Sequence, residues 1–325
     1  MNWMEPCKTA RSGPAAQAKF MHWYKLATPP RGIAVLILTA AMALSGQSAA
    51  RVSAPALGWL LSPDGTGIIS ITGIADSPRD GQNYPLPATA SKIWTSPDAS
   101  AIIAQSVDGL WLITPGVSSR QFAAIDTAVS VAWDRSGSGF VVCQPDRCAE
   151  YSAAGAVRGG FETAGAADVL AYSASAGTLY DIDGAATWHR SSGDTPLGEV
   201  ASGAFLSASK ELWTLGADGR LTGRDANGAV VGSAELVTDA LGLVVSADGN
   251  TLIAANASTA AVYEIRNAEV TRFAVESGIE GVWLAPGNFT VRLHESAKRP
   301  VAFWNGETGA LGWMPAAVAA GERNQ

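Results

Sequence analysis

The chain has 325 residues, of which 47% are hydrophobic and 16% are charged, and it contains 35 glycines and 16 prolines. The charged share lies well below the roughly 25% of an average globular protein, and no long apolar stripe at the helical period follows residue 50, so a helical protein is disfavoured. The formal net charge of −7 argues against nucleic acid or an anionic membrane surface as a partner.

Residues 1–50 are predicted to be a signal peptide, with residues 1–20 as an upstream extension before Met21. Lys25 and Arg31 precede the apolar run Gly32–Leu44, and small residues end the segment at Ala50, as in a secretory leader. The alternative is a membrane anchor. A helix over this apolar run would span about 20 Å, short of the roughly 30 Å hydrocarbon core, which favours cleavage after Ala50.

Removal of the leader leaves residues 51–325 as a single predicted domain. The leader holds five of the 22 basic residues and one of the 29 acidic residues, so the remainder carries a net charge of −11. We expect this mature chain to be periplasmic or secreted, to lack a membrane span and to be a monomer.

Residues 51–325 divide into seven units of similar length. In each unit we mark the residue that opens the turn after the first predicted strand. These positions are Ser62, Ser96, Asp134, Ser173, Ser207, Ser246 and Ala285. Their spacing of 34–39 residues, with short apolar runs in each unit, is typical of propeller blades. The sequence therefore predicts an all-β fold, a seven-bladed β-propeller of four-stranded antiparallel blades. A different division of the units would give six or eight blades.

The first and last units decide how such a ring closes. In the first unit, Ala75–Ala90 contains Pro78, Pro85 and Pro87 and offers only one plausible strand. The last unit has runs for all four strands up to Met314. Arg51–Pro55 could add an outer strand to the last blade, and a ring without such a clasp is the alternative.

Cys143 and Cys148 in the third unit flank the turn Gln144–Arg147 between two strand-like runs. Facing residues of an antiparallel hairpin approach closely enough for a disulfide, which an exported protein would retain. A metal or redox site at this spacing lacks partner ligands. We therefore expect a disulfide.

The sixth unit shows the strand pattern most clearly. Its runs Leu241–Val245, Thr251–Ala255, Ala261–Ile265 and Val270–Val275 are separated by tight turns. A tryptophan stands just before the first turn in other units, at Trp59, Trp94, Trp133 and Trp283. We expect these rings to pack between blades, the alternative being ligand stacking.

The segments SPDG, SPDAS, SADGNTLIAA and AVYEI resemble the turns and strands of the bacterial YVTN and WD40-like propellers, over about residues 57–314. The Gly-His and Trp-Asp signature of true WD40 repeats is absent. The resemblance implies the propeller architecture. Its members include lactonases, lyases, cofactor-dependent dehydrogenases and scaffolds, so it assigns no activity.

Charged residues precede successive first strands and would meet on the face that carries the blade-to-blade loops. The predicted ligand-binding residues of this face are Lys92, Asp126, Asp168, Asp239 and Glu280. A mostly acidic funnel would attract a cation or a basic surface, whereas the plainer alternative is solvated loop charge.

Catalytic signals are sparse. His189 and His294, the two histidines after residue 50, have no Cys or carboxylate at a known metal spacing, so no metal site is predicted. Asp181–Gly184 resembles the start of a calcium loop without the downstream Glu. No cofactor is predicted, although a divalent cation could occupy the funnel. The sequence favours a scaffold that binds an unknown protein or small molecule; the alternative is a lactonase- or lyase-like enzyme with a channel active site.

Overall fold

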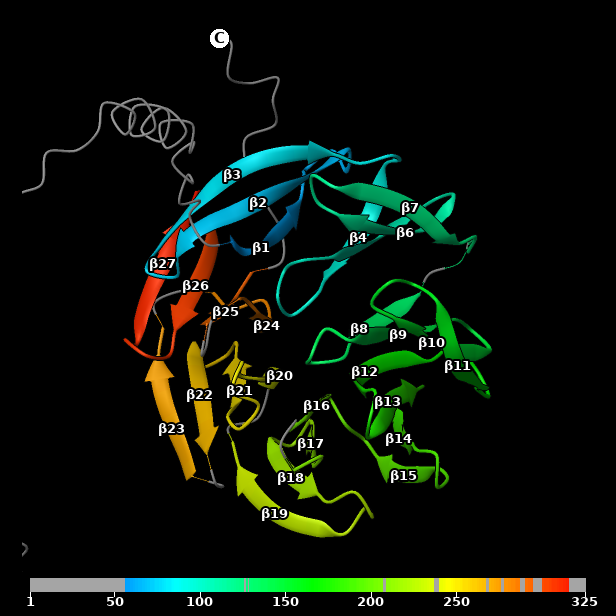
Figure 1. The fold of residues 1–325 in the computed structure, drawn as a ribbon. Coiled ribbons are helices and arrows are strands. Elements are labelled where there is room, and N and C mark those ends of the chain that lie inside the picture. The colour runs from blue at the N-terminus through cyan, green and yellow to red at the C-terminus, as the bar shows by residue number, and fades with distance from the viewer. Residues whose placement is uncertain are drawn as a thin grey trace, which may run out of the picture. The chain divides into compact units, whose positions relative to one another are not determined.

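Seven antiparallel sheets stand around a central axis in the computed structural model (Figure 1). The chain divides into two compact units, Met1–Ser53 and Ala54–Gln325. The residues that the structure describes all belong to the second unit: 56–125, 127, 129–206, 209–236, 240–266, 269–275, 278–286, 290–294 and 300–315. The predicted signal peptide and the clasp at Arg51–Pro55 lie outside the described residues.

Each blade is a meander in which successive strands lie farther from the axis. The innermost strands are β1 (Ala56–Leu61), β4 (Ala90–Thr95), β8 (Ser130–Trp133), β12 (Asp168–Ser173), β16 (Ser202–Phe205), β20 (Ala240–Val245) and β24 (Trp283–Leu284). The second strands are β2 (Gly67–Ile74), β5 (Ile102–Ser106), β9 (Gly139–Cys143), β13 (Gly177–Ile182), β17 (Leu212–Leu215), β21 (Leu252–Asn256) and β25 (Thr290–Arg292). The third strands are β3 (Ser77–Pro85), β6 (Gly109–Thr114), β10 (Arg147–Ser152), β14 (Ala185–His189), β18 (Arg220–Arg224), β22 (Ala261–Arg266) and β26 (Val301–Asn305). The outermost strands are β7 (Ser118–Ala123), β11 (Val157–Glu162), β15 (Thr195–Gly198), β19 (Val230–Glu235), β23 (Glu269–Ala274) and β27 (Ala310–Met314).

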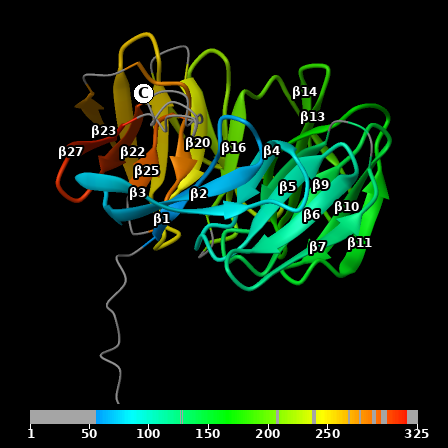
Figure 2. The same cartoon turned by 90° about the horizontal axis from the view of Figure 1, so that it is seen from above.

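The predicted seven-bladed β-propeller is confirmed. Within the described residues, six sheets have four strands and the first, β1-β2-β3, has three. The segment Ala75–Ala90 provides the single strand β3, as its prolines indicated. Seen from the side, the loops lie at the two faces of the ring (Figure 2).

Apolar layers between neighbouring blades hold the ring together. Aromatic residues of the third strands fill several of them, and Trp188 and Trp304 are completely buried. Phe140 stacks on Tyr151 of the same blade with ring centroids 5.2 Å apart. Because neighbouring blades cover each other's sheet faces, closure of the ring buries the apolar side chains between them.

The recurring serine and aspartate of the first turns have a common structural role. The hydroxyl of Ser62 donates to the Asp64 carboxylate at 2.6 Å and accepts the N–H of Gly67 at 2.9 Å. Ser96 and Asp98 repeat the first contact at 2.7 Å. The motif thus fixes the turn between the first and second strands by satisfying backbone groups that the ladder leaves unpaired.

Asp64 is expected to make the fold sensitive to acid. Hydrogen bonds from Ser62 and Thr66 lower the pKa of Asp64 from 3.8 to about 2. A carboxyl whose pKa is lower in the folded chain stabilises the fold above its unfolded pKa, and this contribution is lost as pH falls toward 2. Asp64→Asn should therefore be less stable than the parent at pH 7, and the difference in the free energy of unfolding should shrink between pH 4 and pH 2 in urea titrations. Parallel stability–pH curves for the two proteins would contradict this assignment.

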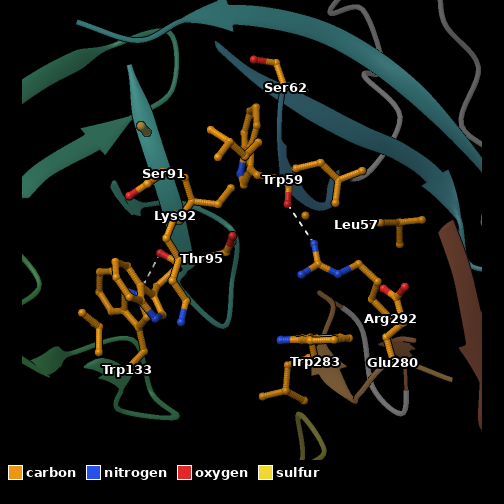
Figure 3. Close-up of a pocket in the computed structure, with 18 of the residues that line it drawn as sticks. Leu57, Trp59, Ser62, Ser91, Lys92, Thr95, Trp133, Glu280, Trp283 and Arg292 are labelled. Atoms are coloured by element: carbon orange, nitrogen blue, oxygen red, sulfur yellow. Dashed lines mark hydrogen bonds between the residues drawn. The ribbon is translucent and has the colours of Figure 1, made fainter. Parts of the chain in front are cut away.

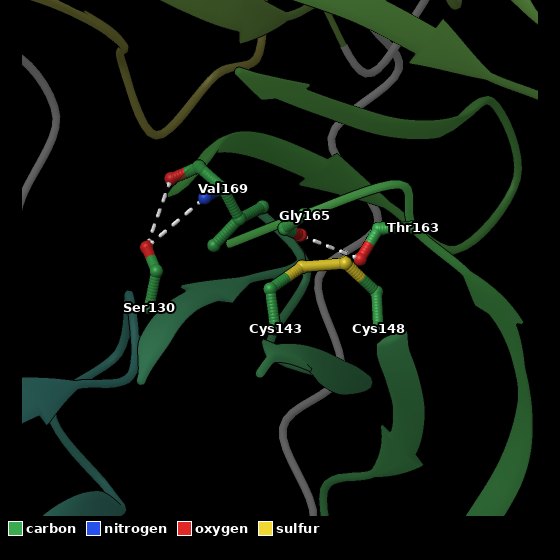
Figure 4. The surroundings of a disulfide bond; sticks show 6 residues. All are labelled: Ser130, Cys143, Cys148, Thr163, Gly165 and Val169. Atoms are coloured by element: carbon green, nitrogen blue, oxygen red, sulfur yellow. Dashed lines mark hydrogen bonds between the residues drawn. A yellow bond between two sulfur atoms is a disulfide. The ribbon is translucent and has the colours of Figure 1, made fainter. Parts of the chain in front are cut away.

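The predicted disulfide is confirmed. Cys143 and Cys148 face each other across β9 and β10, with Cα atoms 4.0 Å apart, and join in a bond that is buried (Figure 4). Beside it, the backbone N–H of Val169 donates to the Ser130 hydroxyl at 3.0 Å and so connects the third blade to the fourth. The disulfide thus reinforces the hairpin at this blade boundary.

Removal of the disulfide should have a modest, measurable cost. The double substitution Cys143→Ala/Cys148→Ala is expected to lower the free energy of unfolding by about 2 kcal/mol, because so short a loop constrains the unfolded chain only weakly. Urea unfolding of the oxidised parent and of the variant measures the difference. An unchanged midpoint would mean that the bond does not restrict the unfolded state.

Contacts between blade 7 and blade 1 close the ring. The Asn305 side-chain amide and the Thr308 hydroxyl both donate to the Asp76 carboxylate, at 3.1 and 3.4 Å. Gly312 of β27 lies directly against the backbone carbonyl of Ala75. Within the described residues each blade is one continuous piece of chain, so side chains and close backbone packing form this seam, with no exchange of strands between its two blades.

Candidate functional site

A cavity of about 1070 Å³ occupies one side of the central channel (Figure 3). Its described lining comes from the inner regions of blades 6, 7, 1, 2 and 3, and blades 4 and 5 contribute nothing to it. The lining includes starts of inner strands, such as Leu57 and Ser91, and the far turns at Asp64 and Pro97. The cavity therefore extends along the inner strands from one end to the other, and it adjoins the seam between blades 7 and 1.

Four tryptophans form a belt in this cavity: Trp59, Trp94, Trp133 and Trp283. They belong to blades 1, 2, 3 and 7, which are consecutive around the closed ring. Trp59 donates its indole N–H to Ala99 O at 2.8 Å, and Trp133 donates to Trp94 O at 3.2 Å. Trp59 and Trp133 therefore bridge neighbouring blades, as expected, and all four rings also line the cavity.

Two cations lie on rings of this belt. The Lys92 ammonium is 5.1 Å from the ring centroid of Trp94, and the Arg292 guanidinium is 5.3 Å from that of Trp283. Arg292 also donates to Trp59 O at 3.0 Å across the seam. These contacts orient both cations, which enter the cavity from opposite sides (Figure 3).

Carboxylates balance the cations. Glu280 and Asp64 both line the cavity, and Glu280 lies beside Arg292 (Figure 3). The Asp64 carboxylate accepts from Ser62 and Thr66, so its orientation is fixed by the turn. The cavity thus combines a large aromatic surface with oriented hydrogen-bond donors and acceptors.

Two further hydrogen bonds link blade 6 to other blades. The N–H of Leu243 donates to the Ser202 hydroxyl at 3.0 Å, joining blades 6 and 5. Arg135 reaches from blade 3 to blade 6 and donates to Ser246 O at 3.1 Å. Burial lowers the pKa of Arg135, while Asp248 and Asp134 oppose that shift. This contact links two blades that are not neighbours in the ring.

The five residues predicted for the acidic funnel are not all found together in the structure. Lys92 and Glu280 line the cavity. Asp168 begins β12 and is exposed, and it is absent from the described lining. Asp126 and Asp239 lie outside the described residues. The sequence interpretation missed Arg292, which reaches the channel from a second strand. The sequence feature that could have identified this cavity is the tryptophan just before the first turn, which recurs in four units that become neighbours once the ring closes.

The two histidines lie away from this cavity. His189 stacks on Phe161 with ring centroids 3.8 Å apart, and its Nδ1 is 2.6 Å from the Asp194 carboxylate. His294 is buried, where its Nε2 meets Gly278 O and its Nδ1 accepts the N–H of Ala302 at 3.2 Å. Among the residues with a described placement, no group of three His, Cys, Asp or Glu could hold a metal ion.

Comparisons with known proteins identify the architecture. No protein-family model and no curated protein matches the chain in sequence. The β-propeller domain of Cps50 (Swd1) from Myceliophteria thermophila is 11% identical with a TM-score of 0.54, over 70% of this chain and 85% of that one. A functionally unknown protein from Desulfotomaculum acetoxidans is 12% identical with a TM-score of 0.56, over 79% and 94% of the two chains.

A third similar structure is PorZ of Porphyromonas gingivalis, a bacterial surface component of the type-IX secretion system. It is 14% identical with a TM-score of 0.55, and the match covers 82% of this chain and 39% of PorZ. At these identities the likeness is one of fold. No helix in the part of the chain that the structure describes has the length and apolarity to cross a membrane.

Proposed function

We propose that this protein is an exported β-propeller that acts as a binding scaffold, and that it captures its partner where the cavity opens among the blade-to-blade loops. The observation that supports this most strongly is the cavity of about 1070 Å³ with four tryptophans on one side of the channel. A concave, largely apolar site with a few oriented polar groups is the usual form of a ligand site. The disulfide and the likeness to a propeller of a bacterial surface component support a location outside the cytoplasm.

The charged residues around the opening are proposed to guide the partner. The sequence places Asp126, Asp168, Asp239 and Glu280 before or at the start of successive first strands, which predicts a mostly acidic face, and Lys92 lines the cavity itself. The net charge of −11 for residues 51–325 favours a partner with a basic surface and disfavours nucleic acid. On this view the face selects the partner and the cavity holds the part of it that inserts.

Charge reversal tests the surface. The double variant Asp168→Lys/Glu280→Lys should lower the affinity for a partner isolated from exported proteins at least about tenfold, measured by calorimetry with the purified partner. Glu269→Lys is the matched control, because Glu269 is exposed on the outermost strand β23. Unchanged affinity in the double variant would remove this face from the proposal. Turnover of the bound partner would instead support the enzyme hypothesis.

A further inference from the structure

We propose that the tryptophan cavity binds a neutral oligosaccharide, which rests on the proposed function in that the cavity is taken to be a ligand site. Three properties of the cavity lead to this ligand class. They are its size and course, the chemistry of its aromatic belt, and the balance of its charges.

The size of the cavity favours a ligand of several rings. Its volume of about 1070 Å³ lies at the upper end of the roughly 300–1,000 Å³ that is usual for small-molecule sites. The lining continues from Ser91 at one end to Pro97 at the other, so the space is extended along the inner strands. A chain of sugar rings matches this course better than a single compact ring.

The aromatic belt suits the flat faces of sugar rings. Indole faces carry partial negative charge and attract partial or full positive charge, as the positions of Lys92 and Arg292 over Trp94 and Trp283 show. The C–H face of a pyranose carries partial positive charge and is apolar. It can therefore pack against the half-buried indole rings of Trp94, Trp133 and Trp283 without a desolvation cost for a formal charge.

The charges of the lining disfavour an ionic ligand. Lys92 and Arg292 would attract an anion, whereas Glu280 and Asp64 would repel it, and the reverse holds for a cation. Sugar hydroxyls both donate and accept hydrogen bonds, so they match ammonium, guanidinium, carboxylate and the hydroxyls of Ser91 and Thr95 alike. Oriented groups of both kinds thus favour a neutral polyhydroxylated ligand.

Titration with defined sugars tests the proposal. Cellotriose, maltotriose and N,N′,N″-triacetylchitotriose are added separately to the full mature chain, and binding is followed by tryptophan fluorescence and calorimetry. We expect saturable binding of at least one of them. Trp283→Ala and Trp94→Ala should each weaken it at least about tenfold, because each removes an aromatic face. Trp313→Ala is the matched control, since Trp313 lies on the outermost strand β27 and outside the described cavity lining, and it should bind as the parent does.

A further variant and a salt control test whether a loss of binding reflects unfolding and whether the ligand is held by charge. Lys92→Met keeps the aliphatic stem over Trp94 and removes the donor, so it should weaken binding several-fold with an unchanged unfolding midpoint. Binding should also persist in 0.5 M NaCl, because neutral ligands do not depend on Coulomb attraction.

Two outcomes would overturn the inference: no saturable binding of any of the three sugars by the folded protein, or binding that disappears in 0.5 M NaCl. If partner capture at the acidic face were lost only in Asp168→Lys/Glu280→Lys while no sugar bound, the scaffold function would stand and the oligosaccharide would not. The scaffold function and the oligosaccharide ligand can therefore be contradicted by different results.

Discussion

Gly312→Ala is expected to destabilise the protein by about 3 kcal/mol or more, because the new methyl group would separate the last blade from the first. A Cβ atom at this position would lie 1.8 Å from the carbonyl oxygen of Ala75 and 2.8 Å from its carbonyl carbon. Both atoms belong to backbone at the seam, so no side-chain rotation can relieve the overlap. Urea unfolding monitored by tryptophan fluorescence measures the loss.

Gly278→Ala is the matched control for this substitution. A methyl group can be added at Gly278 without overlap, because a Cβ atom at this position would meet no atom within 4 Å. Its variant should stay within about 0.5 kcal/mol of the parent. Equal stability of Gly312→Ala and the parent would mean that the ring does not close through this contact.

Trp304→Ala is expected to lower the free energy of unfolding by about 3–5 kcal/mol, since it leaves a large cavity between blades 6 and 7. Trp304 is completely buried among Val291, Ala302 and other apolar residues, and Phe273 lies 5.1 Å away between ring centroids. Thermal and urea unfolding of the variant measure the cost.

Conversion to phenylalanine separates packing from hydrogen bonding at two buried tryptophans. Trp188 donates its indole N–H to Ala176 O at 3.0 Å, whereas the Trp304 N–H has no hydrogen-bond partner among the described residues. Trp188→Phe should therefore cost about 1 kcal/mol more than Trp304→Phe, the net value of one hydrogen bond. Equal costs would mean that packing alone decides stability at both sites.

The blades could be predicted because their turns repeat in sequence. The hydroxyl at Ser62 and the carboxylate at Asp64 each satisfy backbone groups of one turn, and the same chemistry recurs at Ser96 and Asp98. Local hydrogen bonding therefore marks the turn after the first strand in these units. The single strand in Ala75–Ala90 was equally readable, since proline is tolerated in edge strands, and Pro78 and Pro85 both lie in β3 at the edge of the described sheet.

The site could be predicted only in part, because it depends on which blades become neighbours and how far apart they stand. Trp283 and Trp59 are at opposite ends of the chain and come together only when the ring closes. Arg292 reaches the channel past the two-residue strand β24, and strand length at that point cannot be inferred from charge patterns. Loop charge drew attention to Lys92 and Glu280, which both line the cavity, but it gave no account of the aromatic belt.

The cavity adjoins the seam, so a ligand bound there would stabilise the contact between the last blade and the first. Arg292 of blade 7 and Trp59 of blade 1 both line it, and any ligand that touches both spans the boundary between the last blade and the first. Occupancy and closure are then thermodynamically linked, and a ligand at 100 times its dissociation constant would add about 2.7 kcal/mol to the stability of the closed form. The protein without a bound ligand would be the more readily opened and proteolysed species.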